Sequence, residues 1–349
     1  MVLHLQGGIS EVQLTMTRLK LEEILKDELK YRITQVHKLI FSDFIEEWQE
    51  ATILPKNLRN TLDREFPLEI KTKFFFSKDQ KTIKALVYLE DGLATEAVLM
   101  IHPKKRNSIC VSSQVGCPLG CKFCATGKMG FKRNLTTDEI INQVLLFGRL
   151  LKKRGGKITN IVFMGMGEPF LNYDNVLEAI RILNDRDKFN FGSRRISVST
   201  AGLPQAIRKF SGEKLEVNLA ISLHASNDRL RSGLMPVNKG YPIKEVLESV
   251  EEYIKKTGRK VMFEYILLKG VNDRTTDAEE LSMLMSHPLY HLNLIPYNPT
   301  GDFRPSDTTS INKFKNVLKA HDVRFTQRFR FGVDIAAACG QLAGTSTPL

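Results

Sequence analysis

The sequence lacks the features of a secreted or membrane-spanning protein. It contains no run of about eighteen apolar residues, so we expect no segment to span a membrane. Its first residues have neither the basic region nor the apolar core of a signal peptide. Five cysteines, an odd number, do not suit a secreted disulfide framework. We therefore expect a cytoplasmic protein, because the cytoplasm keeps thiols reduced.

Acidic residues are too few to balance the basic ones. Lys and Arg number 51 against 39 Asp and Glu, which gives a formal net charge of +12 and a pI of about 9.4. This balance favours a polyanionic partner, and RNA is the leading candidate. A basic enzyme without such a partner is the alternative. The 349 residues allow one large and one small domain, and we find no internal repeat or low-complexity segment.

The cysteines are unevenly distributed. Four of the five lie between Cys110 and Cys124, and Cys117, Cys121 and Cys124 follow a C-x3-C-x2-C spacing. Thiolates suit zinc or iron–sulfur clusters, and three of them leave one iron of a four-iron cluster open, as in a catalytic site. A zinc knuckle would use a histidine, and the next twenty residues contain none. A redox pair of Cys121 and Cys124 would leave Cys117 unused, so the cluster is favoured.

Strand-like and helical patterns alternate from Ser108 onward, which predicts an α/β fold with a parallel sheet. Strands are expected at residues 109–113, 158–164, 195–200, 217–223, 260–268, 291–295 and 323–327, with helices such as 136–152, 175–184, 242–256 and 277–285 between them. Sites in such folds collect at the C-terminal ends of strands. We expect the polar and cysteine motifs to converge there, because each follows or ends a predicted strand; they are the cysteine loop, Gly165–Glu168, Ser199, Ser222–His224 and Asn298.

The remaining chain divides into four predicted parts. Residues 1–15 show little periodicity and are expected to be a disordered leader, so Met16 is a candidate native start. Residues 16–68 predict a small helical domain, with Pro55 in the first turn of a helix; we interpret its basic faces as an RNA-docking surface, and a merely solvated surface is the alternative. Residues 69–107 predict a β-hairpin extension that turns at Asp91-Gly92. A sheet region, 108–330, then precedes a C-terminal segment, 331–349, that carries Cys339.

Several motifs together closely resemble one family. The cysteine spacing is the signature of the radical S-adenosylmethionine (radical SAM) superfamily. The motifs, in order, are Cys110–Cys117, Cys124–Gly127, Gly165–Pro169, Ser222–His224, Asn298-Pro299 and Ala338–Leu342. They resemble the RlmN family of adenine carbon-2 methyltransferases of ribosomal and transfer RNA, from about Thr17 to Gly344. The resemblance implies a partial (β/α)6 barrel with a small N-terminal helical accessory domain, and a [4Fe-4S] cluster held by Cys117, Cys121 and Cys124.

The resemblance also implies a binding site for SAM. Its expected contacts are Gly167, Glu168, Ser199, Ser222, Leu223, His224 and Asn298. Each has an ordinary alternative, because glycines form turns, serines end strands, and a lone histidine is more often a core residue. Phe123, inside the cysteine loop, either packs beside the adenine of SAM or anchors the loop.

Three further residues carry the reaction that the resemblance implies. Cys339 takes a methyl group from one SAM, a second SAM is cleaved to a 5′-deoxyadenosyl radical, and the methyl carbon then joins carbon 2 of adenine. Cys110, with Glu96 as proton acceptor, releases the product as a Cys110–Cys339 disulfide forms. The alternatives are a buried inert cysteine at position 110 and an exposed glutamate at position 96. Cys339 has no packing value that alanine would lack, which favours a nucleophile.

The expected partners follow from the same resemblance. They are 23S ribosomal RNA, transfer RNA as a second substrate, and a flavodoxin-type electron donor, with the enzyme acting as a monomer. Basic residues near the cysteine loop could bind phosphate or serve solubility; they are Lys104, Lys105, Arg106, Lys128, Lys132 and Arg133. Two rival functions are a carbon-8 adenine methyltransferase of the antibiotic-resistance type and a non-catalytic iron–sulfur RNA-binding protein.

Overall fold

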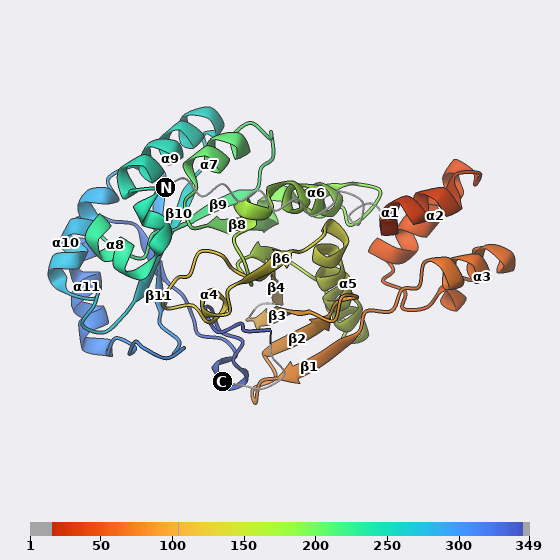
Figure 1. Ribbon diagram of the computed structural model, residues 1–349, viewed down its shortest axis with the longest axis horizontal. Coiled ribbons are helices and arrows are strands. Elements are labelled where there is room, and N and C mark those ends of the chain that lie inside the picture. The colour runs from red at the N-terminus through yellow and green to blue at the C-terminus, as the bar shows by residue number, and fades with distance from the viewer. Residues whose placement is uncertain (1–15, 104, 345–349) are drawn as a thin grey trace.

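One large sheet organises the molecule. The computed structural model describes residues 16–103 and 105–344. Within them, ten strands form a sheet in the order β1-β2-β3-β4-β7-β8-β9-β10-β11-β12 (Figure 1). The first four strands are antiparallel, and every pairing from β4 to β12 is parallel. The predicted combination of a parallel sheet with an antiparallel extension is therefore confirmed.

The parallel strands lie where the sequence places them. They are β4 (Arg106–Val111), β7 (Asn160–Phe163), β8 (Ile196–Thr200), β9 (Asn218–Ser222), β10 (Val261–Leu267), β11 (Tyr290–Pro296) and β12 (Phe325–Gln327). Strands of a parallel sheet are buried on both faces and read as continuous apolar runs. Leu219, Ala220 and Ile221 of β9, for example, are all fully buried. This continuity makes the strands recognisable in the sequence.

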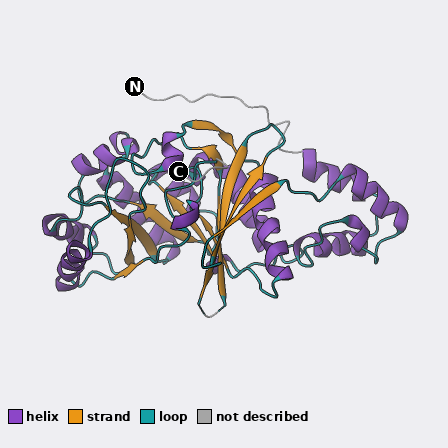
Figure 2. Cartoon of the chain, turned by 90° about the horizontal axis from the view of Figure 1, so that it is seen from below, coloured by secondary structure: helices purple, strands orange, loops and turns teal. Residues whose placement is uncertain are grey.

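Helices connect the parallel strands and cover the outer side of the sheet (Figures 1 and 2). They are α5 (Thr137–Lys153), α6 (Tyr173–Asn184), α7 (Pro204–Phe210), α8 (Asp228–Leu234), α9 (Ile243–Thr257), α10 (Thr275–Leu284) and α11 (Thr308–Ala320). Helix α5 begins with a capping box, in which Thr136 Oγ1 accepts from the Glu139 amide and Glu139 accepts from the Thr136 amide. Helix α9 ends at Gly258, whose φ of 66° is left-handed.

The antiparallel strands extend the sheet beyond β4. They are β1 (Thr72–Phe76), β2 (Thr82–Tyr88) and β3 (Ala94–His102), and the turn at Asp91-Gly92 joins β2 to β3 as predicted. Strand β1 was not predicted, because its run Phe74–Phe76 has no alternation of apolar and polar residues. The pairing of Val98 with Cys110 brings β3 alongside the strand that leads to the cysteine loop.

Helices α1 (Met16–Leu25), α2 (Lys30–Phe41) and α3 (Lys56–Glu65) lie at one end of the molecule, beyond α5 (Figure 1). They enclose the fully buried Trp48, whose Nε1 donates to the carbonyl of Phe66 at 2.7 Å. The placement of Pro55 in the first turn was wrong by one residue, since it is the N-cap of α3. The predicted leader, residues 1–15, lies outside the described residues. None of the described helices is long and apolar enough to cross a membrane.

Candidate active site

The cysteine loop lies between β5 (Gln114–Gly116) and the short helix α4 (Ala125–Lys128). Strand β5 pairs with β6 (Phe131–Asn134) in a separate two-stranded sheet. Gly116 has a φ of 75°, and a Cβ there would lie 1.8 Å from the carbonyl oxygen of Gly130, so only glycine fits. The Lys122 amide donates to the carbonyl of Leu234, which ties the loop to the end of α8. The loop is thus held by backbone contacts on two sides.

The three thiols of this loop are close enough to influence one another's pKa. Burial raises the pKa of Cys117 to about 12. Burial, then Cys124 and Cys117, raises the pKa of Cys121 well above its ordinary value. A bound metal would reverse these effects, because thiolates are what metals bind. All five cysteines are free thiols in the structure.

The arrangement does not suit a single metal ion. Within the part of the chain that the structure describes, no three His, Cys, Asp or Glu side chains are grouped to hold one ion. A single zinc ion would need such a group, whereas in a four-iron cluster each thiolate binds a different iron. Three thiols without a fourth protein ligand match a cluster in which one iron is left open.

Glu168 follows β7 and is buried beside the cysteine loop. Its carboxylate accepts hydrogen bonds from the amides of Phe170 at 3.0 Å and Ala201 at 2.7 Å. Burial raises its pKa to about 7, and the hydrogen bonds oppose this effect. The charge of Glu168 in turn raises the pKa of Cys117 and Cys121. Gly167 has a φ of 98°, and a Cβ there would meet the side chain of Gln114 at 2.5 Å.

His224 follows β9 and packs against the cysteine loop. Its φ of 58° is unusual for a residue with a side chain. The ring accepts from the Ile266 amide at 3.1 Å and meets the ring of Phe123 edge-on, with 4.8 Å between centroids. Burial, with a smaller effect of Arg231, lowers its pKa to about 3, so the ring is neutral. These two contacts hold the His224 ring against Phe123 of the cysteine loop.

The other predicted SAM contacts also gather at strand ends. Ser199 Oγ and Ser222 Oγ are 3.5 Å apart across β8 and β9. Leu223 is fully buried. Asn298 donates from Nδ2 to the carbonyl of Cys339 at 3.3 Å, while its buried Oδ1 has no hydrogen-bond partner among the described residues. A buried acceptor without a partner is costly, so this atom marks a place where a ligand could donate.

Arg231 is a residue of this region that the sequence did not single out. It is fully buried, and its guanidinium donates to the carbonyls of Leu223, Ser222 and Ala201. It also donates to Asn238 Oδ1 at 2.8 Å. Burial lowers its pKa to about 10, so it stays charged at neutral pH. Arg231 joins the ends of β8 and β9 through these hydrogen bonds. No local sequence pattern predicts that an arginine at this position would connect two strands.

The segment that carries Cys339 lies across the cysteine loop. The Ala125 amide donates to the carbonyl of Gly340 at 2.8 Å, and Thr126 Oγ1 donates to the carbonyl of Leu342 at 2.6 Å. The Cys339 side chain is exposed, yet desolvation by the surrounding protein raises its pKa to about 11.

Cys110 and Glu96 lie beside the same segment. Burial raises the pKa of Cys110 to about 12, and the neighbouring Cys339 contributes to this shift. Glu96 is fully buried, so its interpretation as an exposed glutamate was wrong. Its Oε2 accepts from the Ala343 amide at 2.8 Å, and its Oε1 lies 2.8 Å from Lys84 Nζ. The structure therefore brings Cys110, Cys339 and Glu96 together.

Arg328 is a second residue that the sequence did not single out. Its Nη2 donates to Glu264 Oε1 at 2.7 Å, and Asn293 Nδ2 donates to the same oxygen at 3.1 Å. Burial alone would lower the pKa of Arg328. Glu264 and, after it, Cys339 and Cys110 outweigh this effect, so the pKa of Arg328 is raised. Arg328 in turn acts to lower the pKa of both thiols. It is thus the cation that faces the thiol pair.

Two of the basic residues near the cysteine loop are committed to ion pairs. Arg133 makes a two-pronged contact with Glu139, with both distances 2.8 Å, and a further one with Asp91 at 2.6 Å. Lys128 lies 3.1 Å from Asp302. These two residues are less suited to phosphate binding than their positions in the sequence indicated. Lys105, Arg106 and Lys132 are exposed, and Lys104 lies outside the described residues.

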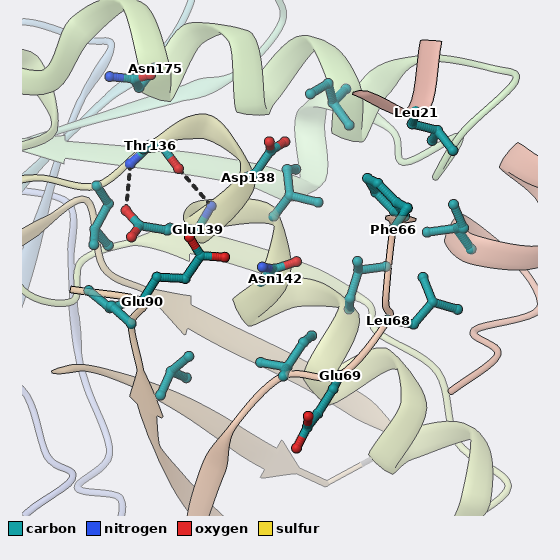
Figure 3. A pocket seen from close by; sticks show the side chains of 18 of the residues that line it. Leu21, Phe66, Leu68, Glu69, Glu90, Thr136, Asp138, Glu139, Asn142 and Asn175 are labelled. Atoms are coloured by element: carbon teal, nitrogen blue, oxygen red, sulfur yellow. Dashed lines mark hydrogen bonds between the residues drawn. The ribbon is translucent and has the colours of Figure 1, made fainter. Parts of the chain in front are cut away.

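A large hollow among the described residues lies elsewhere. It measures about 1650 Å³ and lies between the N-terminal helices, the β2–β3 turn and α5. Figure 3 shows Leu21, Phe66 and Leu68 on one side and Thr136, Asp138, Glu139 and Asn142 on the other. None of the five cysteines lines it. The reactive side chains described above therefore belong to a different part of the surface.

The comparisons with known proteins agree with this geometry. Residues 111–281 match the family model described as the radical SAM superfamily. A probable dual-specificity RNA methyltransferase RlmN of Dictyoglomus turgidum is 46% identical over 317 residues, which is 90% of this chain and 91% of that protein. A ribosomal RNA large subunit methyltransferase N of Nitrosopumilus maritimus is 42% identical over 90% of this chain and 92% of its own.

A solved structure extends the likeness to the fold. The crystal structure of a radical SAM methyltransferase from Sphaerobacter thermophilus has 44% sequence identity to this chain and a TM-score of 0.90. The match covers 95% of this chain and 99% of that one. The antiparallel strands and the N-terminal helices thus belong to the shared architecture.

Proposed function

Because this chain belongs to the RlmN family of radical SAM RNA methyltransferases, we propose that it methylates carbon 2 of an adenosine in RNA. The observation that carries the proposal is the position of Cys339. Its segment crosses the cysteine loop, and Cys110 and Glu96 lie along the same segment. A non-catalytic iron–sulfur protein would have no use for two thiols outside the cluster ligands.

Cys117, Cys121 and Cys124 would hold the [4Fe-4S] cluster. When bound, the cluster supplies the electron that cleaves SAM. Gly167, Glu168, Ser199, Ser222, Leu223, His224 and Asn298 would surround SAM, two of which are used in each turnover. The free acceptor of Asn298 and the buried carboxylate of Glu168 suit a ligand with hydrogen-bond donors and a positive charge.

Cys339 is the methyl carrier in this proposal. Carbon 2 of adenine is electron-poor and cannot attack a methyl donor, so the methyl group must first be placed on a nucleophile of the protein. A thiolate is such a nucleophile, and Arg328 favours that form of Cys339 against the effect of burial. The sulfur loses its proton and forms a bond to the methyl carbon as the bond from that carbon to the sulfonium of SAM breaks. This step releases S-adenosylhomocysteine and leaves Cys339 as a thioether close to Cys110.

Cys110 and Glu96 act after the carbon is joined to adenine. Glu96 accepts the proton from carbon 2, and Cys110 attacks the sulfur of Cys339. Before this stage the methyl group has lost one hydrogen atom to the 5′-deoxyadenosyl radical, and the joined species gives up one electron together with the proton from carbon 2. The bond between the sulfur of Cys339 and the carbon then breaks as the disulfide forms, and the carbon keeps the bonding electron pair and takes up a proton. A reductant returns both thiols. The structure holds both cysteines as free thiols, which is the state that begins a cycle.

The proposed substrates are 23S ribosomal RNA and transfer RNA, and the proposed electron donor is flavodoxin-type. The basic charge of +12 supports an RNA substrate. We propose that the enzyme acts as a monomer. The target base must leave its stack to reach Cys339, as other base-modifying enzymes require.

Nucleoside analysis tests the proposed reaction. The anaerobically reconstituted protein is incubated with SAM, a reductant and unmodified 23S ribosomal RNA, and the digested RNA is read by mass spectrometry. The proposal predicts 2-methyladenosine together with 5′-deoxyadenosine and S-adenosylhomocysteine. The carbon-8 isomer would favour the resistance-type activity instead. Absence of all three products with an intact cluster would refute the enzyme assignment.

A further inference from the structure

Phe329 is the most exposed large apolar side chain among the described residues. It is 84% exposed, and Met283 follows at 71%. Burying a phenylalanine is worth about 1.5–3 kcal/mol, so a fully exposed ring forgoes a large favourable contribution. An exposed aromatic ring of this kind suits a surface that a partner covers.

The backbone around Phe329 is fixed by its neighbours on both sides. The Arg328 amide donates to the carbonyl of Leu294 at 2.9 Å, and its guanidinium donates to Glu264 at 2.7 Å. Arg330 Nη2 donates to the carbonyl of Tyr297 at 3.2 Å. Since residues 328 and 330 are both anchored to the protein, the ring between them is held out toward solvent. Its exposure therefore comes from the fold rather than from a loose end.

The segment that carries Phe329 adjoins the segment that carries Cys339, because Arg330 donates to the carbonyl of Tyr297 and the next residue, Asn298, donates to the carbonyl of Cys339. Arg328, on the other side of Phe329, is close enough to influence the pKa of both Cys110 and Cys339. Phe331 meets the ring of His102 edge-on at 4.7 Å, and Arg106 contacts that histidine at 3.0 Å. Aromatic rings and guanidinium groups therefore alternate along this edge.

We propose that Phe329 is a platform on which an unpaired base of the RNA substrate stacks, close to the segment that carries Cys339. The inference rests on the proposed function, because it assumes an RNA substrate. A base that leaves its stack loses the contact of its neighbours, and an aromatic side chain replaces that contact in proteins that bind single strands. Arg330 and Arg106 supply positive charge for the adjoining phosphates.

The affinity of variants tests this role. Full-length reconstituted enzyme, without SAM, is titrated into a fluorescently labelled RNA hairpin with an unpaired adenosine in its loop. Phe329→Ala and Phe329→Leu should raise Kd about 5- to 150-fold, equivalent to about 1–3 kcal/mol of stacking, whereas Phe329→Trp should bind as the wild type does. The slope of log Kd against log salt should stay unchanged, because stacking neutralises no phosphate. Met283→Ala, which changes another exposed apolar side chain, on α10, is the control and should leave Kd unaltered.

The Phe329→Trp variant also reports the contact directly. The only native tryptophan, Trp48, is fully buried, so a quencher such as acrylamide reaches the introduced indole first. Saturating RNA should protect the introduced indole from acrylamide, because a stacked base covers its face.

The outcomes separate the two proposals. Wild-type affinity for Phe329→Ala, a changed salt slope, or an introduced indole that stays accessible in saturating RNA would each overturn the stacking role and leave the methyltransferase proposal standing. A wild-type enzyme that binds no RNA would overturn both.

Discussion

The ion pair between Lys84 and Glu96 allows a quantitative prediction. Lys84 Nζ lies 2.8 Å from Glu96 Oε1, and the two side chains are 4% and 1% exposed. The pair joins β2 to β3, and Glu96 also accepts from the Ala343 amide of the Cys339 segment. Replacing Lys84 by methionine keeps the length of the side chain but leaves the Glu96 carboxylate buried without its cation.

The expected cost follows from that burial. Removing one partner of a buried ion pair typically destabilises a protein by about 3–5 kcal/mol, because the remaining charge is uncompensated. Replacing both partners by uncharged groups of similar shape costs much less. Lys84→Met should therefore lower the free energy of unfolding by about 3–5 kcal/mol. The double variant Lys84→Met/Glu96→Gln should regain more than half of that loss.

Urea unfolding of the cluster-free protein, followed by circular dichroism, measures these differences. The ion pair of Lys153 with Glu46 provides the control, because its side chains are 66% and 41% exposed. Lys153→Met should cost no more than about 1 kcal/mol. A Lys84→Met variant as stable as Lys153→Met, or a double variant less stable than Lys84→Met, would refute the reasoning.

Three further predictions concern the thiols. Cys339→Ala should keep the cluster, seen by its absorbance, and reduce methylation of RNA to background, since only the methyl carrier is removed; loss of the cluster would contradict this. Cys110→Ala should leave RNA covalently attached to Cys339 on a denaturing gel, and an active variant without attached RNA would argue against the role of Cys110. In cluster-free protein, alkylation of Cys339 by iodoacetamide should rise about tenfold per pH unit toward its pKa of about 11, because burial raises that pKa and the thiolate is the reactive form. A rate that levels off near pH 8 would contradict the shift.

Much of the fold was readable from the sequence because parallel strands are buried on both faces. The runs Ile161–Phe163 and Leu219–Ile221 are apolar, and Ile161 and Leu219 are fully buried. Strand β1 escaped prediction because Phe74–Phe76 lies at the edge of the sheet without an alternating pattern. The sequence therefore predicts central strands better than edge strands.

The site was only partly readable from the sequence. The cysteine spacing and the motifs at strand ends each lie within a short stretch of chain, so they can be recognised in the sequence. Arg328 pairs with Glu264 from 64 positions away, and Lys84 meets Glu96 across a strand pairing. Such pairings depend on the folded arrangement of distant strands. Residues that hold the catalytic groups in place are therefore harder to predict than the groups themselves.

Isotope transfer from labelled SAM tests the central claim, which is that Cys339 carries the methyl group. The enzyme is first supplied with SAM whose methyl group carries three deuterium atoms, and the methyladenosine product is weighed by mass spectrometry. A carbon that is joined to Cys339, loses one hydrogen and is then passed to adenine should arrive with two deuterium atoms. Peptide mapping before RNA is added should find the labelled methyl group on Cys339. A product with all three deuterium atoms, or an unmodified Cys339, would contradict the account.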